Sequence, residues 1–282
     1  MLIDTHAHLW FDDYSIDLEQ VIERAKLAGV EKMIVPGTDF ASSKKAIELA
    51  KKYPGVIYAA VGVHPEELLN RNFEESPLWL RELLGNAVAI GEIGTDASTE
   101  ELRSCMDEQK ELFKAQCELA LEHDLPVIIH TRDSFEETWE VLTSLPKMPR
   151  GQFHCFSVDE TALKMVVEHG FCVSFCGNIT WSKRVAKLVS LVPDDRLLLE
   201  TDSPFMMPRD KKGESVHWGA NGAESSDLSF ASLQTAGRSE LEDRNEPSNV
   251  RLLAEKIAEL RGQSLEKIAE MTTKNAKTLY RL

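Results

Sequence analysis

The sequence lacks the features of disulfide-rich and membrane-spanning proteins. Its five cysteines form no Cys-x-x-Cys pair and their number is odd, which argues against a disulfide framework or a zinc knuckle and for buried free thiols. No apolar run reaches the roughly 20 residues that span a membrane. The start of the chain, Leu2–Asp4, has neither the basic nor the long apolar region of a signal peptide. We therefore expect a cytoplasmic protein.

Positive charge is also scarce. The chain has 32 lysine and arginine residues against 47 aspartate and glutamate residues, a formal net charge of −15. Non-specific binding of nucleic acid depends on basic side chains that neutralise phosphates, so this balance argues against it. The balance does not exclude a nuclease, because bound cations can supply positive charge at the site itself.

Short apolar segments alternate with amphipathic helical segments along the 282 residues. This alternation predicts parallel βαβ units, and eight of them predict a (β/α)8 TIM barrel, an α/β fold, as a single domain over residues 1–282. An open doubly wound sheet would give a similar pattern. The expected strands are Leu2–Leu9, Lys32–Pro36, Val56–Val63, Ala87–Ile93, Pro126–His130, Gln152–Phe156, Phe171–Phe175 and Leu197–Glu200. The expected helices are Asp17–Ala28, Ser42–Lys52, one containing Trp79–Leu84, Asp107–His123, Ser134–Leu145, Thr161–His169, Ser182–Val192, Ser248–Arg261 and Ser264–Leu282.

One segment, Arg209–Arg244, breaks this alternation, because its many polar residues and glycines show little periodicity. A loop of this length inside a compact domain is either functional or disordered. Since it follows the eighth strand, it would lie at the active-site end of a barrel. We expect a mobile insertion that is not part of the core.

Two histidines one residue apart, His6 and His8, end the first apolar run. Side chains two residues apart in a strand point the same way, so both imidazoles should project from one face. Two imidazoles on one face can hold a divalent metal. The alternative is two hydrogen-bonded histidines near the N-terminus, and the remaining strands must supply further ligands to decide between them.

Histidines and carboxylates end four other predicted strands. The carboxyl ends of barrel strands meet at one end of the barrel, where the active sites of this fold lie, so these side chains should converge. Four histidines, a glutamate and an aspartate suit two divalent ions (zinc, magnesium or manganese) that share a carboxylate. Two ions about 3.5–4 Å apart can activate water for a displacement. The predicted ligands are His6, His8, Glu92, His130, His154 and Asp202.

The acidic residues of this set have distinct predicted roles. We expect Glu92 to bridge the two ions. Asp202 can both bind a metal and take the proton from the attacking water. Glu200 shares strand parity with Asp202 but lies one step deeper, so we expect it to support a ligand rather than to be one.

Two further residues are candidates for binding substrate. Arg132 can meet a phosphate in fork geometry, or it can pair structurally with Asp133 or Glu136. His64 precedes Pro65 and can either face the substrate or hydrogen-bond at a turn.

These residues lie in six short motifs. In chain order the motifs are Asp4-Thr5-His6-Ala7-His8-Leu9, Gly62-Val63-His64-Pro65, Gly91-Glu92-Ile93-Gly94, Leu125-Pro126-Val127-Ile128-Ile129-His130-Thr131-Arg132, His154-Cys155-Phe156-Ser157 and Glu200-Thr201-Asp202-Ser203-Pro204. The ordered set resembles the TatD-type metal-dependent deoxyribonucleases of the amidohydrolase superfamily. The resemblance runs from Leu2 to the final helix. It implies a TIM-barrel hydrolase with DNA as its substrate.

The resemblance also implies the polarity of cleavage, stepwise from a 3′ end, and the division of the ligands. Single strands should be the easier substrate, because the acidic surface offers no broad basic track for a duplex. We expect no stable protein partner, no contact with membranes, and a monomer. By match of motif, one ion takes His6, His8, Glu92 and Asp202, and the other takes Glu92, His130 and His154.

Three departures from the family leave the ligands intact but affect substrate preference. Gly94–Ser98 replaces the usual Gly-Leu-Asp followed by aromatics, Val158 replaces a common glycine, and the link to Arg244–Pro247 is much longer. The main alternative is an amidohydrolase or lactonase that acts on a small molecule. Many such relatives bridge their metals with a carbamylated lysine on the fourth strand, where this chain has Glu92 and no lysine nearby. A non-catalytic binding module is the other alternative, for which a complete ligand set would serve no purpose.

Overall fold

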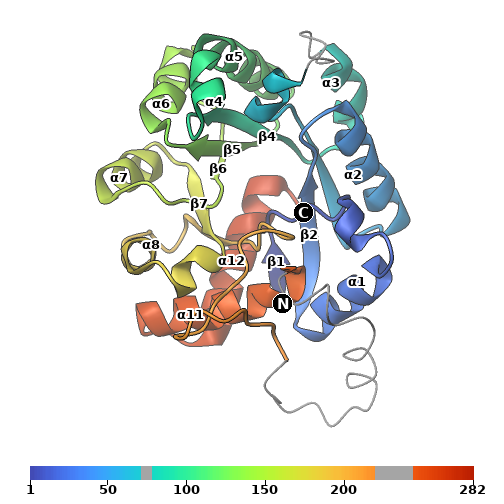
Figure 1. Cartoon of the computed structure of the whole chain (residues 1–282), viewed down its shortest axis with the longest axis vertical. Helices are drawn as coiled ribbons and strands as arrows, with labels where there is room; N and C mark the ends of the chain where they lie inside the picture. Colours follow the sequence, from blue (N-terminus) through green and yellow to red (C-terminus); the bar gives the residue numbers. More distant parts are fainter. Residues whose placement is uncertain (71–77, 220–243) are drawn as a thin grey trace.

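Eight parallel strands form a nearly closed barrel in the computed structural model, which describes residues 1–70, 78–219 and 244–282 (Figure 1). The strands pair in sequence order from first to last, whereas an open doubly wound sheet reverses its strand order. The TIM barrel is therefore confirmed. The strands are β1 (Leu2–Asp4), β2 (Val30–Pro36), β3 (Ile57–Val61), β4 (Ala89–Asp96), β5 (Val127–Arg132), β6 (Gly151–Phe153), β7 (Cys172–Phe175) and β8 (Leu197–Leu199).

The first and last strands meet beside the predicted ligands. The amide of Thr5 donates to the carbonyl of Leu199 over 2.9 Å, and Ala7 forms a parallel bridge with Ser203. These contacts continue past the formal ends of β1 and β8. The segments that carry His6 and Asp202 are consequently held side by side.

Helices cover the outside of the barrel (Figure 1). None of the described helices is long and apolar enough to cross a membrane. The α-helices are α1 (Leu18–Leu27), α2 (Phe40–Lys52), α3 (Leu78–Leu83), α4 (Glu100–Ser104), α5 (Met106–Glu122), α6 (Phe135–Ser144), α7 (Glu160–Glu168), α8 (Lys183–Val189), α11 (Val250–Arg261) and α12 (Leu265–Tyr280). The 3₁₀ turns are η1 (Asp12–Tyr14), η2 (Pro65–Leu69), η3 (Leu84–Asn86), η4 (Gly177–Thr180) and η5 (Pro247–Asn249).

Two helical predictions were wrong in detail. We expected the second helix to begin at Ser42, but α2 begins two residues earlier, at Phe40, and is capped by Asp39. Ser42 instead returns the hydrogen bond as the other half of a capping box. The short helix α4 was not expected, because five residues are too few to show a period.

The final helix closes the barrel at the amino ends of the strands. One buried apolar cluster joins residues of seven strands to Ala276, Leu279 and Tyr280 of α12. The Tyr280 hydroxyl donates to Gln152 of β6 over 2.6 Å. Since this end is filled by side chains, substrate can approach only from the opposite end, which we call the mouth.

The insertion predicted at Arg209–Arg244 is described only at its ends, and residues 220–243 lie outside the described residues. At one end, Arg209 forms an antiparallel bridge with Ser215, and Trp218 packs against the main core. At the other, the Arg244 guanidinium is buried and bonds to Asp17. Both ends thus pack against the rest of the protein. The prediction of a mobile insertion then concerns residues 220–243 alone, and it stays a prediction there.

Candidate metal centre

The segment after β1 presents two imidazoles to one point. The His8 amide donates to the carbonyl of Ser203 over 2.7 Å, and the Asp202 amide donates to the carbonyl of His6 over 2.9 Å. These bonds keep the chain extended, so the two rings point the same way, as predicted. The Nε2 atoms of His6 and His8 lie 3.0 Å apart, and both side chains are buried.

Glu92 of β4 lies between two groups of imidazoles. Its Oε2 is 3.2 Å from His6 Nε2 and 3.4 Å from His8 Nε2. Its Oε1 is 2.9 Å from His130 Nδ1 and 2.8 Å from His154 Nε2. The two carboxylate oxygens therefore face different histidines, with His64 Nε2 a third neighbour of Oε1 at 3.5 Å. This is the arrangement expected of a bridging ligand.

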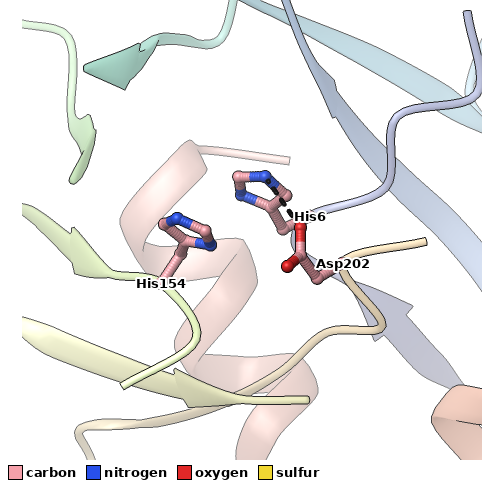
Figure 2. A group of neighbouring side chains, drawn as sticks. All are labelled: His6, His154 and Asp202. Carbon is pink, nitrogen blue, oxygen red and sulfur yellow. Dashed lines mark ion pairs between the residues drawn. The ribbon is translucent and has the colours of Figure 1, made fainter. Parts of the chain in front are cut away.

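Asp202 approaches from the segment after β8. Its Oδ1 is 3.6 Å from His6 Nε2 and 3.5 Å from His8 Nε2. Figure 2 shows its carboxylate beside His6, with the ring of His154 on the other side. The rings of His6 and His154 are stacked, with centroids 4.1 Å apart. The structure thus gathers all six predicted ligands into one group, which we call the metal centre.

The separations within the metal centre match those of ligands around a common ion. Ligand bonds of about 2.0–2.2 Å place neighbouring ligand atoms roughly 3–3.5 Å apart, as found here. Four groups of described residues have candidate ligand atoms within 4.8 Å of one another. Three of them include predicted ligands, and one of these three brings in His64, which we had predicted to bind substrate. These three groups are His6, His8 and Glu92; His6, His154 and Asp202; and His64, Glu92 and His130.

Electrostatics keep both carboxylates ionised. Burial raises the pKa of Glu92, but the imidazoles of His154 and His6 outweigh it, and the pKa lies well below its usual value. Burial likewise opposes ionisation of Asp202, yet the hydrogen bond from His8 and nearby imidazoles lower its pKa. In the described chain, these two carboxylates form ion pairs only with histidines. Among residues 1–70, 78–219 and 244–282, no lysine or arginine pairs with either carboxylate, so a bound cation would supply the fixed positive charge.

Two further carboxylates, Asp96 and Glu200, lie behind the histidines. Asp96 Oδ2 lies 2.9 Å from His130 Nε2, which turns Nδ1 of that ring toward Glu92. Burial raises the pKa of Asp96, but the His130 hydrogen bond outweighs it and holds the pKa at about 2. Glu200 accepts from the Cys155 amide and the Ser174 hydroxyl, and its Oε1 is 3.7 Å from His154 Nδ1.

Asp96 was missed because β4 was predicted to end at Ile93, whereas it continues to Asp96. The strand parity that Asp96 shares with Glu92 would have found it. The strand can run on because Gly94 has a φ of +148°, and a Cβ there would lie 1.9 Å from the carbonyl oxygen of His130. A side chain at this position would therefore displace a predicted ligand.

His64 makes the predicted hydrogen bond at a turn, while its predicted role toward substrate stays a prediction. Its Nδ1 accepts from the Glu66 amide over 3.2 Å at the start of η2. Its Nε2 is 3.5 Å from Glu92 Oε1. In the neutral ring, Nε2 then carries the proton, and burial favours that neutral form by lowering the pKa of His64.

Arg132 ends β5 and is exposed. Neither alternative partner, Asp133 or Glu136, forms an ion pair with it, and its side chain makes no hydrogen bond to the described residues. The guanidinium is thus available at the mouth, where its predicted role toward substrate stays a prediction.

Known proteins resemble this chain along its whole length. The family model described as TatD related DNase matches residues 3–281. The metal-dependent hydrolase YabD of Bacillus subtilis is 38% identical over 287 residues, which cover 100% of both chains. The 3′-5′ ssDNA/RNA exonuclease TatD of Pantoea vagans is 31% identical over 287 residues, again with 100% of both chains covered.

Solved structures agree with the sequence comparisons. The structure of YjjV, a TatD homologue from Escherichia coli, superimposes with a TM-score of 0.81 at 28% identity, covering 100% of this chain and 98% of that one. A TatD-family hydrolase from Entamoeba histolytica gives 0.80 at 25% identity, with 99% and 97% covered. This chain therefore belongs to the TatD-related DNase family of metal-dependent hydrolases.

Proposed function

We propose that this chain hydrolyses phosphodiester bonds with two divalent ions and removes nucleotides from the 3′ end of single-stranded DNA. The position of Glu92 carries the proposal, because its two oxygens face different imidazoles. A carboxylate placed in this way can ligate two ions at once. The proposed sets are His6, His8, Glu92 and Asp202 for one ion, and Glu92, His130 and His154 for the other.

The donor atoms fit such ions. Imidazole nitrogens and carboxylate oxygens suit zinc and manganese, and the carboxylates also suit magnesium. The Nε2 atoms of His6 and His8, only 3.0 Å apart, cannot both be hydrogen-bond donors to one another, whereas both can donate electron pairs to one cation. When bound, two divalent metal ions would lower the pKa of a water molecule and stabilise negative charge on the attacking and leaving oxygens.

The two central carboxylates differ in access to solvent. The side chain of Asp202 is 13% exposed, against 4% for Glu92. Asp202 can therefore meet water at the mouth and accept the proton of the attacking water, while the buried Glu92 stays a ligand. The backbone amide of Asp202 donates a hydrogen bond to the carbonyl of His6, which holds Asp202 in place for this task.

His64 and Arg132 are proposed to hold the substrate. The protonated Nε2 of His64 points into the metal centre and can donate to a phosphoryl oxygen. Arg132 lies two residues beyond His130 at the mouth, and its fork of donors suits a phosphate. Neutral His64 and cationic Arg132 would thus orient the same phosphodiester from two strands.

The choice of DNA rests on the relatives. The TatD protein of Pantoea vagans is named a 3′-5′ ssDNA/RNA exonuclease and resembles this chain from end to end, which supports a nuclease. The net charge of −15 disfavours long-range binding of a duplex. A free end of a single strand that enters the mouth needs no such surface.

Purified protein with magnesium or manganese should shorten 5′-labelled single-stranded oligonucleotides in a ladder from the 3′ side, and a chelator should stop it. Asp202→Asn should abolish the ladder because the proton acceptor is lost. Asp195→Asn is the matched control, since Asp195 is exposed before β8 and its one ion pair within the described residues is with Arg196. It should cleave like the parent.

The alternative function, hydrolysis of a lactone or cyclic amide, is tested in the same panel. No cleavage of single-stranded DNA, duplex DNA or RNA with any divalent metal, together with turnover of such a small molecule, would replace our proposal by the alternative.

A further inference from the structure

Three aromatic rings surround the outer side of the proposed ligand His8. Its ring centroid lies 5.7 Å from Trp10, 5.9 Å from Phe11 and 6.1 Å from Phe205. Phe11 packs edge to face against Phe205 at 5.3 Å, and Trp10 stacks on Phe11 at 4.4 Å. We call Trp10, Phe11 and Phe205 the aromatic cluster.

The cluster is assembled where the barrel closes. Trp10 and Phe11 follow β1, and Phe205 follows β8, the two strands that meet beside the metal centre. Asn245 holds the β8 side in place, because its side-chain amide donates to the carbonyls of Thr201 and Phe205. The Trp10 indole donates to the carbonyl of Pro36. Two fixed backbone segments therefore set the separation of the rings from His8.

The side chain of Phe205 is exposed to solvent, although large apolar side chains nearby are buried. Its exposed fraction is 49%, while Tyr14, in the neighbouring turn η1, is 1% exposed. Exposed phenylalanine and tryptophan residues of the described chain all lie in segments that follow carboxyl ends of strands, namely Phe40, Trp181 and Phe205. Among these three, Phe205 is the one in ring contact with a proposed ligand.

We propose that Phe205, supported by Phe11, is a stacking subsite for the base of the 3′-terminal nucleotide whose phosphodiester lies at the metal centre. This inference rests on the proposed function and names the part of the substrate that the site recognises. Proteins that hold single strands stack bases on aromatic side chains, and this stacking tolerates every base because each has a π face. An unpaired terminal base can reach such a ring, whereas a base inside a duplex cannot.

The chemistry of the cluster makes the proposal specific. Its rings offer apolar faces, and the one polar group among them, the Trp10 indole N–H, is already bonded to Pro36. The subsite should therefore sense whether a base is present but not which base it is. Recognition of base identity would require hydrogen-bonding groups directed at the base edges.

The test compares two oligonucleotides that differ only at the 3′ end, one with adenine and one with an abasic tetrahydrofuran residue. The parent protein should cleave the adenine end with a KM about tenfold lower, the lower part of the range for one base stacked on an aromatic ring. In Phe205→Ala this ratio should fall to about one. The ratio should vary little when thymine, cytosine or guanine replaces adenine.

Trp181→Ala is the control, because Trp181 is equally exposed (52%) but makes no ring contact with the cluster in the described chain. It should keep the parent ratio. Binding is read independently with 2-aminopurine at the 3′ end, whose fluorescence is quenched on stacking. The parent and Trp181→Ala should quench it, and Phe205→Ala should not.

The outcomes separate this inference from the proposed function. Cleavage of both ends with equal KM by the parent, or an unchanged ratio in Phe205→Ala, would overturn the stacking subsite and leave the nuclease intact. A parent protein that neither cleaves nor binds any oligonucleotide would overturn both.

Discussion

Two clusters of buried charge in this chain differ in where their counter-charge comes from. In the metal centre, Glu92 and Asp202 face only histidines within the described residues. The second cluster, which we call the arginine network, pairs two guanidinium groups with two carboxylates. It consists of Asp17, Arg24, Arg244 and Glu246.

The charges of the arginine network are paired with one another within the chain. Arg244 bonds to both oxygens of Asp17 at 2.8 Å, and Arg24 reaches Glu246 at 2.7 Å. These pairs join α1 to the segment that precedes η5, more than 200 residues later in the sequence. Buried charges that are matched within the chain hold its parts together, whereas buried carboxylates that lack a fixed cation create a place for one to bind. The comparison thus separates a cluster that we expect to stabilise the fold from one that we propose to bind metal.

The largest expected effect is on the metal centre. Glu92→Ala should lower the metal content below two per chain and reduce hydrolysis by more than about a hundredfold, since loss of an outer partner alone costs up to that much. Glu246→Gln, in the arginine network, is the control and should keep the metal content of the parent. Elemental analysis and oligonucleotide hydrolysis measure both. Unchanged stoichiometry and turnover in Glu92→Ala would remove the bridging role.

The converse effect belongs to the arginine network. Arg244→Ala leaves Asp17 partly buried with one of its two partners gone, and we expect a loss of about 3–5 kcal/mol in the free energy of unfolding. Metal content should not change. Arg251→Ala breaks an exposed pair with Glu255 and should cost no more than about 1 kcal/mol. Urea denaturation distinguishes the two, and equal losses would show that the network is not stabilising.

A smaller effect is expected behind the metal centre. Asp96→Asn removes the charge that orients His130, and we expect a 10–100-fold loss of metal affinity or activity, in the range known for outer partners of ligating histidines. Titration with manganese measures the affinity. A variant with parent affinity and activity would show that Asp96 does not act through His130.

The smallest effect is a pH dependence of the arginine network. Burial raises the pKa of Asp17, but the hydrogen bonds from Arg244 and Arg24 outweigh it, so its pKa is lower in the folded protein. A depressed folded pKa stabilises the protein above the unfolded value of about 3.9, and that stability is lost as pH falls through the folded pKa. The stability difference between parent and Asp17→Asn should thus be present at pH 7 and shrink below about pH 3.9. A difference that is constant down to pH 2 would contradict this assignment.

The two clusters also differ in how far the sequence predicts them. The barrel and the metal centre follow from local patterns, because each predicted ligand ends an apolar strand and the fold brings strand ends together. The arginine network has no such signal. Arg24 and Glu246 lie 222 residues apart, and only the folded chain shows that they meet.

Other features lay between these extremes. Asp96 had a usable signal, its strand parity with Glu92, but the predicted strand stopped too early to include it. The turn hydrogen bond of His64 was one of two predicted alternatives, and its role toward substrate stays a prediction. The aromatic cluster had no signal in the sequence, because the approach of Phe205 to Phe11 depends on the closure of β8 against β1.

The central claim is that two ions share Glu92, and a crystal structure of the parent protein with manganese tests it most directly. The anomalous difference map should contain two peaks about 3.5–4 Å apart, one beside each oxygen of Glu92, with His6 and His8 on one and His130 and His154 on the other. A single peak at saturating manganese, or two peaks that do not share Glu92, would contradict the account.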